Sequence, residues 1–335
     1  MSLENRPSDE MISLLRQSGD ADASIAIPAQ REFASALETP LRKGVLVGNI
    51  LGDIFEKVNM EPGASPEFPL DLISPGLEGE HIAYTNPGHG RIPERAVEGD
   101  YVMIPTYSIA SSVDYLLRFA RDARWDVVAR AMQVMEAGFT KKMNDDGWHT
   151  ILAAGVDRNI LVYDADAAQG SFSKRLVSLM QVVMRRNSGG NSASAGRGRL
   201  TDLYVSPEAL EDIRNWGETE VDEVTRREIY TSAEGGPAIT RIFGVNLHDL
   251  DELGEGQEYQ EFFLNDLGGS LASGKSELVV GIDQSTNDSF VMPVREDLKV
   301  FEDPALHRQQ RAGFYGWAEL GFGVLDNRRI ILGSF

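Results

Sequence analysis

Cysteine is absent from the 335-residue sequence, as are long hydrophobic runs. Without cysteine, disulfides, thiol catalysis and cysteine-ligated metal sites are excluded, and the composition suits a reducing cytoplasm. No stretch approaches the run of about 18 apolar residues that a membrane-spanning helix needs, so we predict no membrane partner. The first residues, MSLENRPSDEM, are polar and acidic, unlike a secretory signal.

Positive charge is also scarce. The chain has 32 Lys and Arg against 52 Asp and Glu, a formal net charge of −20. A protein that grips nucleic acid needs a basic face that releases counterions. General DNA binding is therefore disfavoured, and any contact with DNA is expected to be non-specific. The 42% of hydrophobic residues suffices for a sizeable core in two domains or one elongated domain.

Catalytic and metal-binding patterns are weak. The five histidines show no pair at ligand spacing, and neither a phosphate-binding Walker loop nor a G-x-S-x-G elbow occurs. Asp249, Asp251 and Gly254 partly match a calcium loop, but Leu253 and Gln260 stand where oxygen ligands belong. We therefore predict no catalytic residue, no cofactor site and no metal site, and an enzyme is the least favoured interpretation.

Residues 110–146 predict one long helix without proline. Apolar residues recur there at steps of three and four, which keeps them on one side of a helix. About 35 residues at about 1.5 Å each give a rod of about 50 Å. The predicted core positions of this helix are Val113, Leu117, Val128 and Met135.

Two segments before this helix have little core of their own. Residues 1–40 look like an arm, with Phe33 and Leu37 at helical spacing, and Thr39-Pro40 predicts the start of a new helix. Residues 81–86 and 95–109 look extended and flank the turn sequence PGHGRIPE, which predicts a long hairpin. A hairpin with few large apolar residues must lie on another surface. Arm and hairpin are therefore both expected to contact a neighbouring subunit. The hairpin tip is predicted to make its contacts through Asn86, Pro87, Gly88, His89, Gly90, Arg91 and Ile92.

The remainder predicts a mixed α/β domain and a set of returning strands. In residues 200–215, a strand runs into a helix with Ser206 as cap, Pro207 at the first position and Glu208 in the first turn. Residues 171–186 predict an amphipathic helix. From residue 277 onward the pattern favours strands, the last two forming a hairpin that packs on the long helix.

This order of parts resembles the major capsid proteins of tailed double-stranded DNA bacteriophages, the Hong Kong 97-type fold. Three stretches carry the resemblance: DARWDVVARAMQVMEAGFTKKMNDDGWHTILAAG is similar to the spine-helix region, GRLTDLYVSPEALEDIRNW to the axial domain, and FEDPALHRQQRAGFYGWAELGFGVLDNRRIILGSF to the closing strands. The resemblance implies an α+β fold with an N-terminal arm (1–40), an extended loop (62–106), a peripheral domain with the spine helix (41–61, 107–156 and 289–335) and an α/β axial domain (157–288).

The resemblance also implies a function. Such proteins assemble as hexamers and pentamers of an icosahedral shell around packaged DNA, in the host bacterial cytoplasm, with portal and scaffolding proteins and, in some cases, a decoration protein. Some members cross-link neighbouring subunits through a lysine of the extended loop. Here no lysine lies between Lys57 and Lys141, so no such cross-link is expected. The arm begins at once, so the scaffold is expected to be a separate protein. An encapsulin-like nanocompartment shell is the alternative.

Overall fold

The computed structural model describes residues 9–48, 50–61, 63–69, 101–187, 198–216, 241–285 and 289–335. The chain divides into two compact units. Unit 1 comprises Met1–Pro66, Met103–Gly147 and Val291–Gly323, and unit 2 comprises Glu67–Val102, Trp148–Phe290 and Val324–Phe335. In the described part of the chain, no helix is long and apolar enough to cross a membrane.

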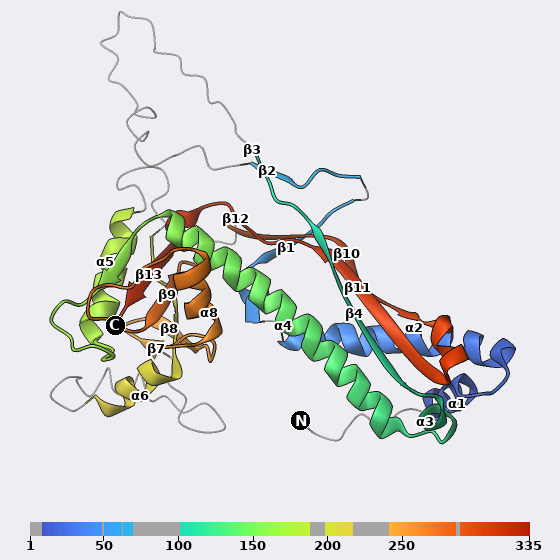
Figure 1. The fold of residues 1–335 in the computed structure, drawn as a ribbon. Coiled ribbons are helices and arrows are strands. Elements are labelled where there is room, and N and C mark those ends of the chain that lie inside the picture. Colours follow the sequence, from blue (N-terminus) through green and yellow to red (C-terminus); the bar gives the residue numbers. More distant parts are fainter. Residues whose placement is uncertain are drawn as a thin grey trace, which may run out of the picture. The chain divides into compact units, whose positions relative to one another are not determined.

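Unit 1 is built from helices and one long sheet, shown as a ribbon in Figure 1. Its elements are α1 (Asp9–Ser18), α2 (Ala23–Gly48), η1 (Ile50–Asp53), β1 (Glu56–Asn59), β4 (Tyr107–Leu116), α3 (Leu117–Arg121), β10 (Phe290–Glu302), η4 (Pro304–Gln309), β11 (Arg311–Leu320) and β12 (Gly323–Val324). Helix α4 (Trp125–Asp157) begins in unit 1 and ends in unit 2. A separate two-stranded ribbon pairs β2 (Glu67–Pro69) with β3 (Tyr101–Met103).

The sheet of unit 1 has the order β1-β10-β11-β4, and β12 also pairs with β10. Alternate residues of β11 face inward and are buried, among them Phe314 and Ala318. Helix α4 covers this inner face: a Cβ added at Gly316 would lie 2.5 Å from the Met135 methyl group. Helix α2 packs beside α4, because a Cβ at Gly44 would meet the Glu136 carboxyl group at 2.3 Å. The core of unit 1 is therefore the space between α2, α4 and the sheet.

The predicted helix over residues 110–146 is wrong at both ends. Residues 107–116 form strand β4, which pairs with β11 over ten consecutive positions. The short helix α3 then ends at Arg121, and Ala123 adopts a positive φ of 50° before α4 begins. Helix α4 continues to Asp157, past the end expected from the sequence. A partner strand some 200 residues away in the sequence supplies the pairing that makes 107–116 a strand.

The arm prediction is corrected by α2. This helix runs unbroken through Pro40, where the sequence predicted a new start. Its buried positions recur every four residues on both sides of that proline: Ala29, Phe33, Leu37, Leu41 and Val45. Burial of this stripe against the rest of unit 1 offsets the cost of about 3 kcal/mol for a proline inside a helix.

Unit 2 contains a six-stranded sheet of order β5-β13-β9-β6-β8-β7. Its elements are β5 (Leu161–Tyr163), α5 (Lys174–Asn187), β6 (Asp202–Val205), α6 (Pro207–Asn215), β7 (Arg241–Ile242), β8 (Val245–Asp249), α8 (Glu258–Glu261), the π-helical turn η3 (Phe262–Asp266), β9 (Leu278–Ile282), η5 (Asn327–Arg329) and β13 (Ile330–Ser334). Apolar residues of α5 and α6 share one core cluster with those of the sheet, including Met180, Ile213 and Ile331.

Two predictions about unit 2 have opposite outcomes. The strand-to-helix step is confirmed: Ser206 caps α6 by accepting a hydrogen bond from the Ala209 N–H, and Pro207 opens the helix. The predicted C-terminal hairpin is wrong. Strand β11 belongs to the sheet of unit 1, whereas β13 lies between β5 and β9 in unit 2. Residues 324–335 therefore belong with the α/β unit and not with the peripheral segment 289–335 expected from the sequence.

Candidate functional site

Of the residues predicted to contact a neighbouring subunit, the structure describes those of the arm but not those of the hairpin tip. The hairpin tip, Asn86 to Ile92, lies outside the described residues, so its contacts stay a prediction. Phe33 and Leu37 were expected to contact another subunit, but they are 2% and 1% exposed within their own chain. The Phe33 ring packs edge-on against Trp125, with ring centroids 6.2 Å apart. The arm residues are therefore buried inside unit 1 and unavailable to a neighbour in this arrangement.

The four predicted helix-core residues lie on three different elements. Val128 and Met135 are fully buried on α4, and Leu117 is buried on α3. Val113 lies on strand β4 and is only partly buried, so its assignment to the helix is wrong.

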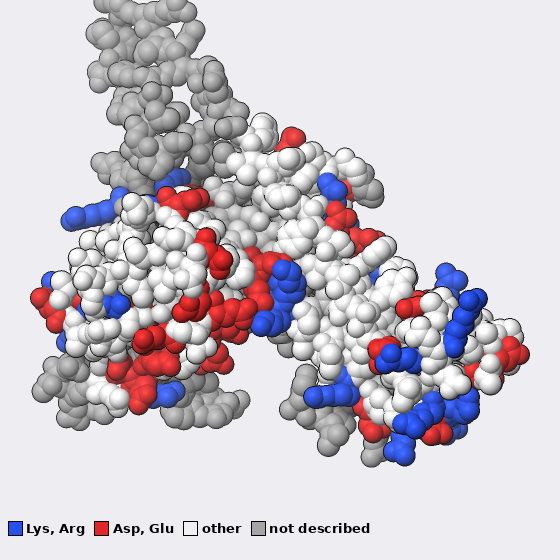
Figure 2. Space-filling model, in the orientation of Figure 1, with Lys and Arg blue, Asp and Glu red and all other residues white. Residues whose placement is uncertain are grey.

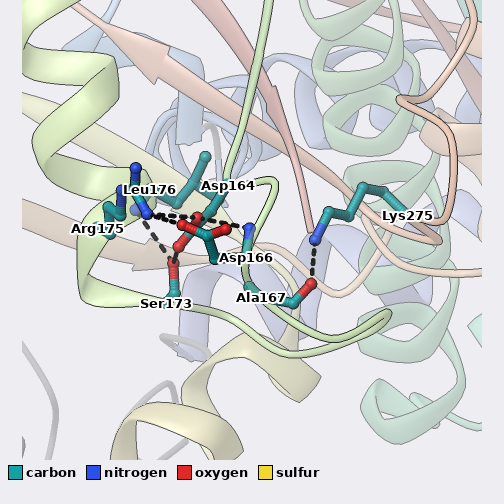
Figure 3. Close-up of polar contacts among 7 residues, drawn as sticks. All are labelled: Asp164, Asp166, Ala167, Ser173, Arg175, Leu176 and Lys275. Atoms are coloured by element: carbon teal, nitrogen blue, oxygen red, sulfur yellow. Dashed lines mark hydrogen bonds and ion pairs between the residues drawn. The ribbon is translucent and has the colours of Figure 1, made fainter.

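No catalytic arrangement emerges among the described residues. They contain no group of three His, Asp or Glu side chains placed to hold a metal ion. The most elaborate polar cluster surrounds Asp164 in unit 2 (Figure 3), and its contacts account for the buried carboxylate. The Ser173 hydroxyl donates to Asp164 Oδ2 at 2.7 Å, and the Asp166 N–H donates to Oδ1 at 3.1 Å.

Charged groups complete that cluster. The Arg175 guanidinium lies 3.6 Å from Asp164 and also pairs with Asp166, while Lys275 Nζ donates to the Ala167 carbonyl at 2.7 Å. Burial alone would raise the pKa of Asp164, but the hydrogen bonds and the two cations hold it below its usual value. These contacts fix the loop before α5.

Carboxylates gather on unit 2, over α6 and α8 (Figure 2). Residues 249–261 carry six Asp or Glu and no Lys or Arg. Glu208 and Glu255 act on the nearby carboxyl group of Glu277, which is 6% exposed. Burial and these like charges raise the pKa of Glu277, although the Ser206 hydroxyl bonds to it. This surface repels anions.

Positive charge is concentrated at one end of unit 1 (Figure 2). A cleft of about 600 Å³ lies there between α3 and η4. Its lining includes Arg118, Arg121, His307 and Arg308, the polar Gln309 and Gln310, and the apolar Ala21, Leu116 and Leu117. Within the described ranges, none of these three arginines forms an ion pair; Arg121 instead donates to the Gly19 carbonyl at 3.3 Å. The two units thus differ strongly in surface charge, although both contain more acids than bases.

The outer face of the unit 1 sheet exposes aromatic side chains. Tyr315 and Trp317 on β11 are 38% and 42% exposed. Phe301 of β10 packs against both rings, with centroids 5.6 and 5.7 Å away. Exposed aromatic groups of this kind are enriched at protein–protein interfaces. This face of unit 1 therefore has the residue composition of a protein–protein contact surface.

Comparison with solved structures identifies the fold. The chain is similar to the capsid of cyanophage Pam1 (TM-score 0.54, 12% identity, 84% of this chain and 88% of that one). It is also similar to the capsid of an empty GTA particle (TM-score 0.52, 16% identity, 85% and 95%) and to the capsid of Myoviridae phage XM1 (TM-score 0.51, 11% identity, 85% and 90%). The chain has the fold of phage capsid proteins. No family model and no curated protein matches the sequence. This mixed α+β capsid fold spans both units, and the matched proteins are covered almost completely.

The exposed sheet surface was missed from the sequence. Tyr107 and Ile109 lay in the predicted extended run 95–109, and Val113 and Tyr115 continue the same alternation, but apolar steps of three and four from residue 110 onward favoured a helix. Phe301, Tyr315 and Trp317 come together only because β10 and β11 pair, with Phe301 opposite Tyr315.

Proposed function

We propose that this chain is the major capsid protein of a tailed phage or of a related phage-derived particle. The single observation that carries the proposal is the extent of the fold match, which covers about 85% of this chain and 88–95% of capsid chains from three sources. Partial matches would be compatible with a shared domain in an unrelated protein. A match over nearly the whole length of each chain favours the same architecture and the same structural task.

In this proposal the parts take the roles implied by the resemblance. Unit 1 corresponds to the peripheral domain, with α4 as the spine helix, and unit 2 to the axial domain, with residues 324–335 added to it. Residues 62–106 form the extended loop, whose tip at 86–92 contacts an adjacent subunit. Copies assemble as pentamers and hexamers of a closed shell. Portal, scaffolding and decoration proteins are further partners, and assembly takes place in the host bacterial cytoplasm.

The negative net charge of the chain favours a shell protein over a nucleic-acid-binding protein. With a net charge of −20, the subunit repels DNA over most of its surface. Contact with packaged DNA is therefore non-specific and weak, and the acidic surface over α6 and α8 keeps DNA from adhering wherever it faces the lumen.

The test is assembly of the purified protein. The chain is produced alone and together with candidate scaffolding proteins, then followed by light scattering and negative-stain electron microscopy. The expected result is rings of five and six subunits or closed shells of uniform diameter. A folded chain that stays monomeric at the highest attainable concentration, with and without scaffold, would contradict the proposal. Shells that carry an enzyme cargo instead of a portal would favour the encapsulin-like alternative.

A further inference from the structure

The cleft between α3 and η4 lies within unit 1 and is lined mainly by polar and positively charged groups. Six of its nine described lining residues are polar or charged, and none of the nine is Asp or Glu. Its volume of about 600 Å³ falls in the range of about 300–1,000 Å³ that is usual for small-ligand sites. Most such sites are apolar, so the lining of this cleft favours a negatively charged ligand.

The positive side chains come from two segments that are far apart in the sequence. Arg118 and Arg121 are three residues apart on α3, so they lie on the same side of that helix. His307 and Arg308 lie in the last turn of η4. The three arginines repel one another, and no described carboxylate lines the cleft to offset that repulsion. A bound anion would remove this unfavourable term.

The walls of the cleft are joined by backbone contacts. The Leu117 N–H donates to the Gln310 carbonyl at 2.9 Å, which ties α3 to the end of η4. A Cβ added at Gly19 would lie 2.4 Å from the Arg121 backbone nitrogen, so the turn between α1 and α2 lies directly on α3. The Arg121 side chain also donates to the Gly19 carbonyl at 3.3 Å. A cleft whose walls are already fixed loses little conformational entropy when a ligand binds.

The turn between α1 and α2 also contacts η4 without bringing a carboxylate into the cleft. The His307 ring nitrogen Nε2 lies 3.1 Å from the Asp20 carbonyl oxygen, which can only accept, so Nε2 carries the proton. The side chain of Asp20 accepts from the Asp22 N–H at 2.9 Å. The side chain of Asp22 in turn accepts from the N–H and the hydroxyl of Ser24. Both carboxylates are therefore occupied within the turn.

Two of the arginines are available to a ligand. Arg118 and Arg308 are exposed, and neither forms an ion pair with a described residue. Arg118 Cζ lies 4.9 Å from the centroid of the Phe119 ring, a contact that uses the face of the guanidinium and leaves its N–H groups for an acceptor. A guanidinium presents five N–H donors in a plane, which suits the oxygens of a phosphate.

We propose that this cleft binds a phosphate group, with Arg118 and Arg308 as donors and Arg121 as a further cation. A phosphate is favoured over a carboxylate because its tetrahedral oxygens can accept from several arginines at once, whereas one guanidinium satisfies both oxygens of a carboxylate. The phosphate has two sources, the backbone of a nucleic acid and free phosphate in solution. The inference goes beyond the proposed function, because it requires only a folded unit 1 and no shell.

Titration calorimetry with inorganic phosphate tests the site on the full-length chain, kept below the concentration at which it assembles. At low salt and neutral pH the natural chain should bind phosphate. Arg118→Ala and Arg308→Ala should each weaken this binding about tenfold, the worth of one hydrogen bond between charged groups. The matched control is Arg241→Ala, which removes an exposed arginine of unit 2 and should leave phosphate binding unchanged.

Fluorescence anisotropy with a short labelled DNA duplex distinguishes the two sources. If the site takes the backbone of a nucleic acid, Arg118→Ala and Arg308→Ala should also weaken duplex binding. The slope of log affinity against log salt concentration should then fall by about 0.9 for each phosphate contact that is lost. If the two variants weaken only the binding of inorganic phosphate, the site takes free phosphate, and the proposal holds with that source.

A conservative variant keeps the test valid if an alanine variant does not fold. Arg308→Lys retains the charge but loses the planar set of donors, so it should still weaken phosphate binding. Three results would overturn the inference: no phosphate binding by the natural chain, natural affinity in both alanine variants, or binding of a glutamate-rich peptide without binding of phosphate. The last result would assign the cleft to an acidic protein. Because shell assembly is a separate measurement, a failure here is distinguishable from a failure of the proposed function.

Discussion

Truncation of Phe33 tests whether the N-terminal helix is part of the folded subunit. The side chain is 2% exposed and packs edge-on against Trp125 at 6.2 Å between ring centroids. Replacing a buried Phe with Ala costs about 3–5 kcal/mol, from lost transfer energy and the cavity left behind. The edge-to-face contact contributes about 0.5–1.5 kcal/mol of this. Since domains are stable by about 5–15 kcal/mol, F33A should lower the stability of unit 1 by a large fraction.

The assay is urea unfolding of the dissociated chain, followed by tryptophan fluorescence and circular dichroism. F33A should lower the unfolding free energy by about 3 kcal/mol or more. F33L retains most of the volume but not the ring contact, so it should cost about 1 kcal/mol. The matched control is E32A, one residue away on the exposed side of α2, where a change within about 0.5 kcal/mol is expected. If F33A unfolds like the natural chain and impairs only assembly, α2 does not pack in its own subunit and the description of unit 1 is wrong.

Three further predictions follow from the packing, the buried carboxyl group and the composition. Gly313→Ala should lower the unfolding free energy of unit 1 by about 1–3 kcal/mol in urea, because the added Cβ would lie 2.6 Å from the Val113 carbonyl oxygen across the β11–β4 pair. The control is Gly52→Ala, whose added Cβ would have nothing within 4 Å. If both variants lost the same unfolding free energy, the β11–β4 register would be refuted. Glu277→Gln should stabilise unit 2 at neutral pH and make its unfolding free energy depend less on pH. The reason is that the pKa of Glu277 in the folded chain is raised above its ordinary value of 4.5. The protonated carboxyl group therefore contributes its full stabilisation below pH 4.5, and this contribution is lost as the pH rises through the folded pKa. Unchanged thermal unfolding profiles between pH 4 and pH 8 would contradict this. Mature shells should dissolve in hot detergent to single chains, since no lysine lies between Lys57 and Lys141; a ladder of covalent oligomers on the gel would show a cross-link that the sequence does not anticipate.

Local signals in the sequence were sufficient where one segment determines its own structure. The step from β6 into α6 was predicted because Ser206, Pro207 and Glu208 each favour a helix start for a separate physical reason. The α+β class and the likeness to phage capsid proteins also followed from the order of such segments.

Long-range pairing decided what the sequence could not show. The apolar residues of 107–116 are compatible with both a helix and a strand, and β11 selects the strand. The path of α2 through Pro40 depends on a buried stripe whose covering partners, α4 and the sheet, are remote in the sequence. The place of β4 at the end of the strand order could not be anticipated at all, because that place is defined only by the order of the described strands in the finished sheet.

An electron cryomicroscopy map of particles assembled from this chain tests the central claim most directly. The account predicts a closed shell whose wall consists of rings of five and six copies of this chain, each with the two units described above. A map that shows this protein as a minor component inside or outside a shell made by another protein, or no shell at all, would contradict it.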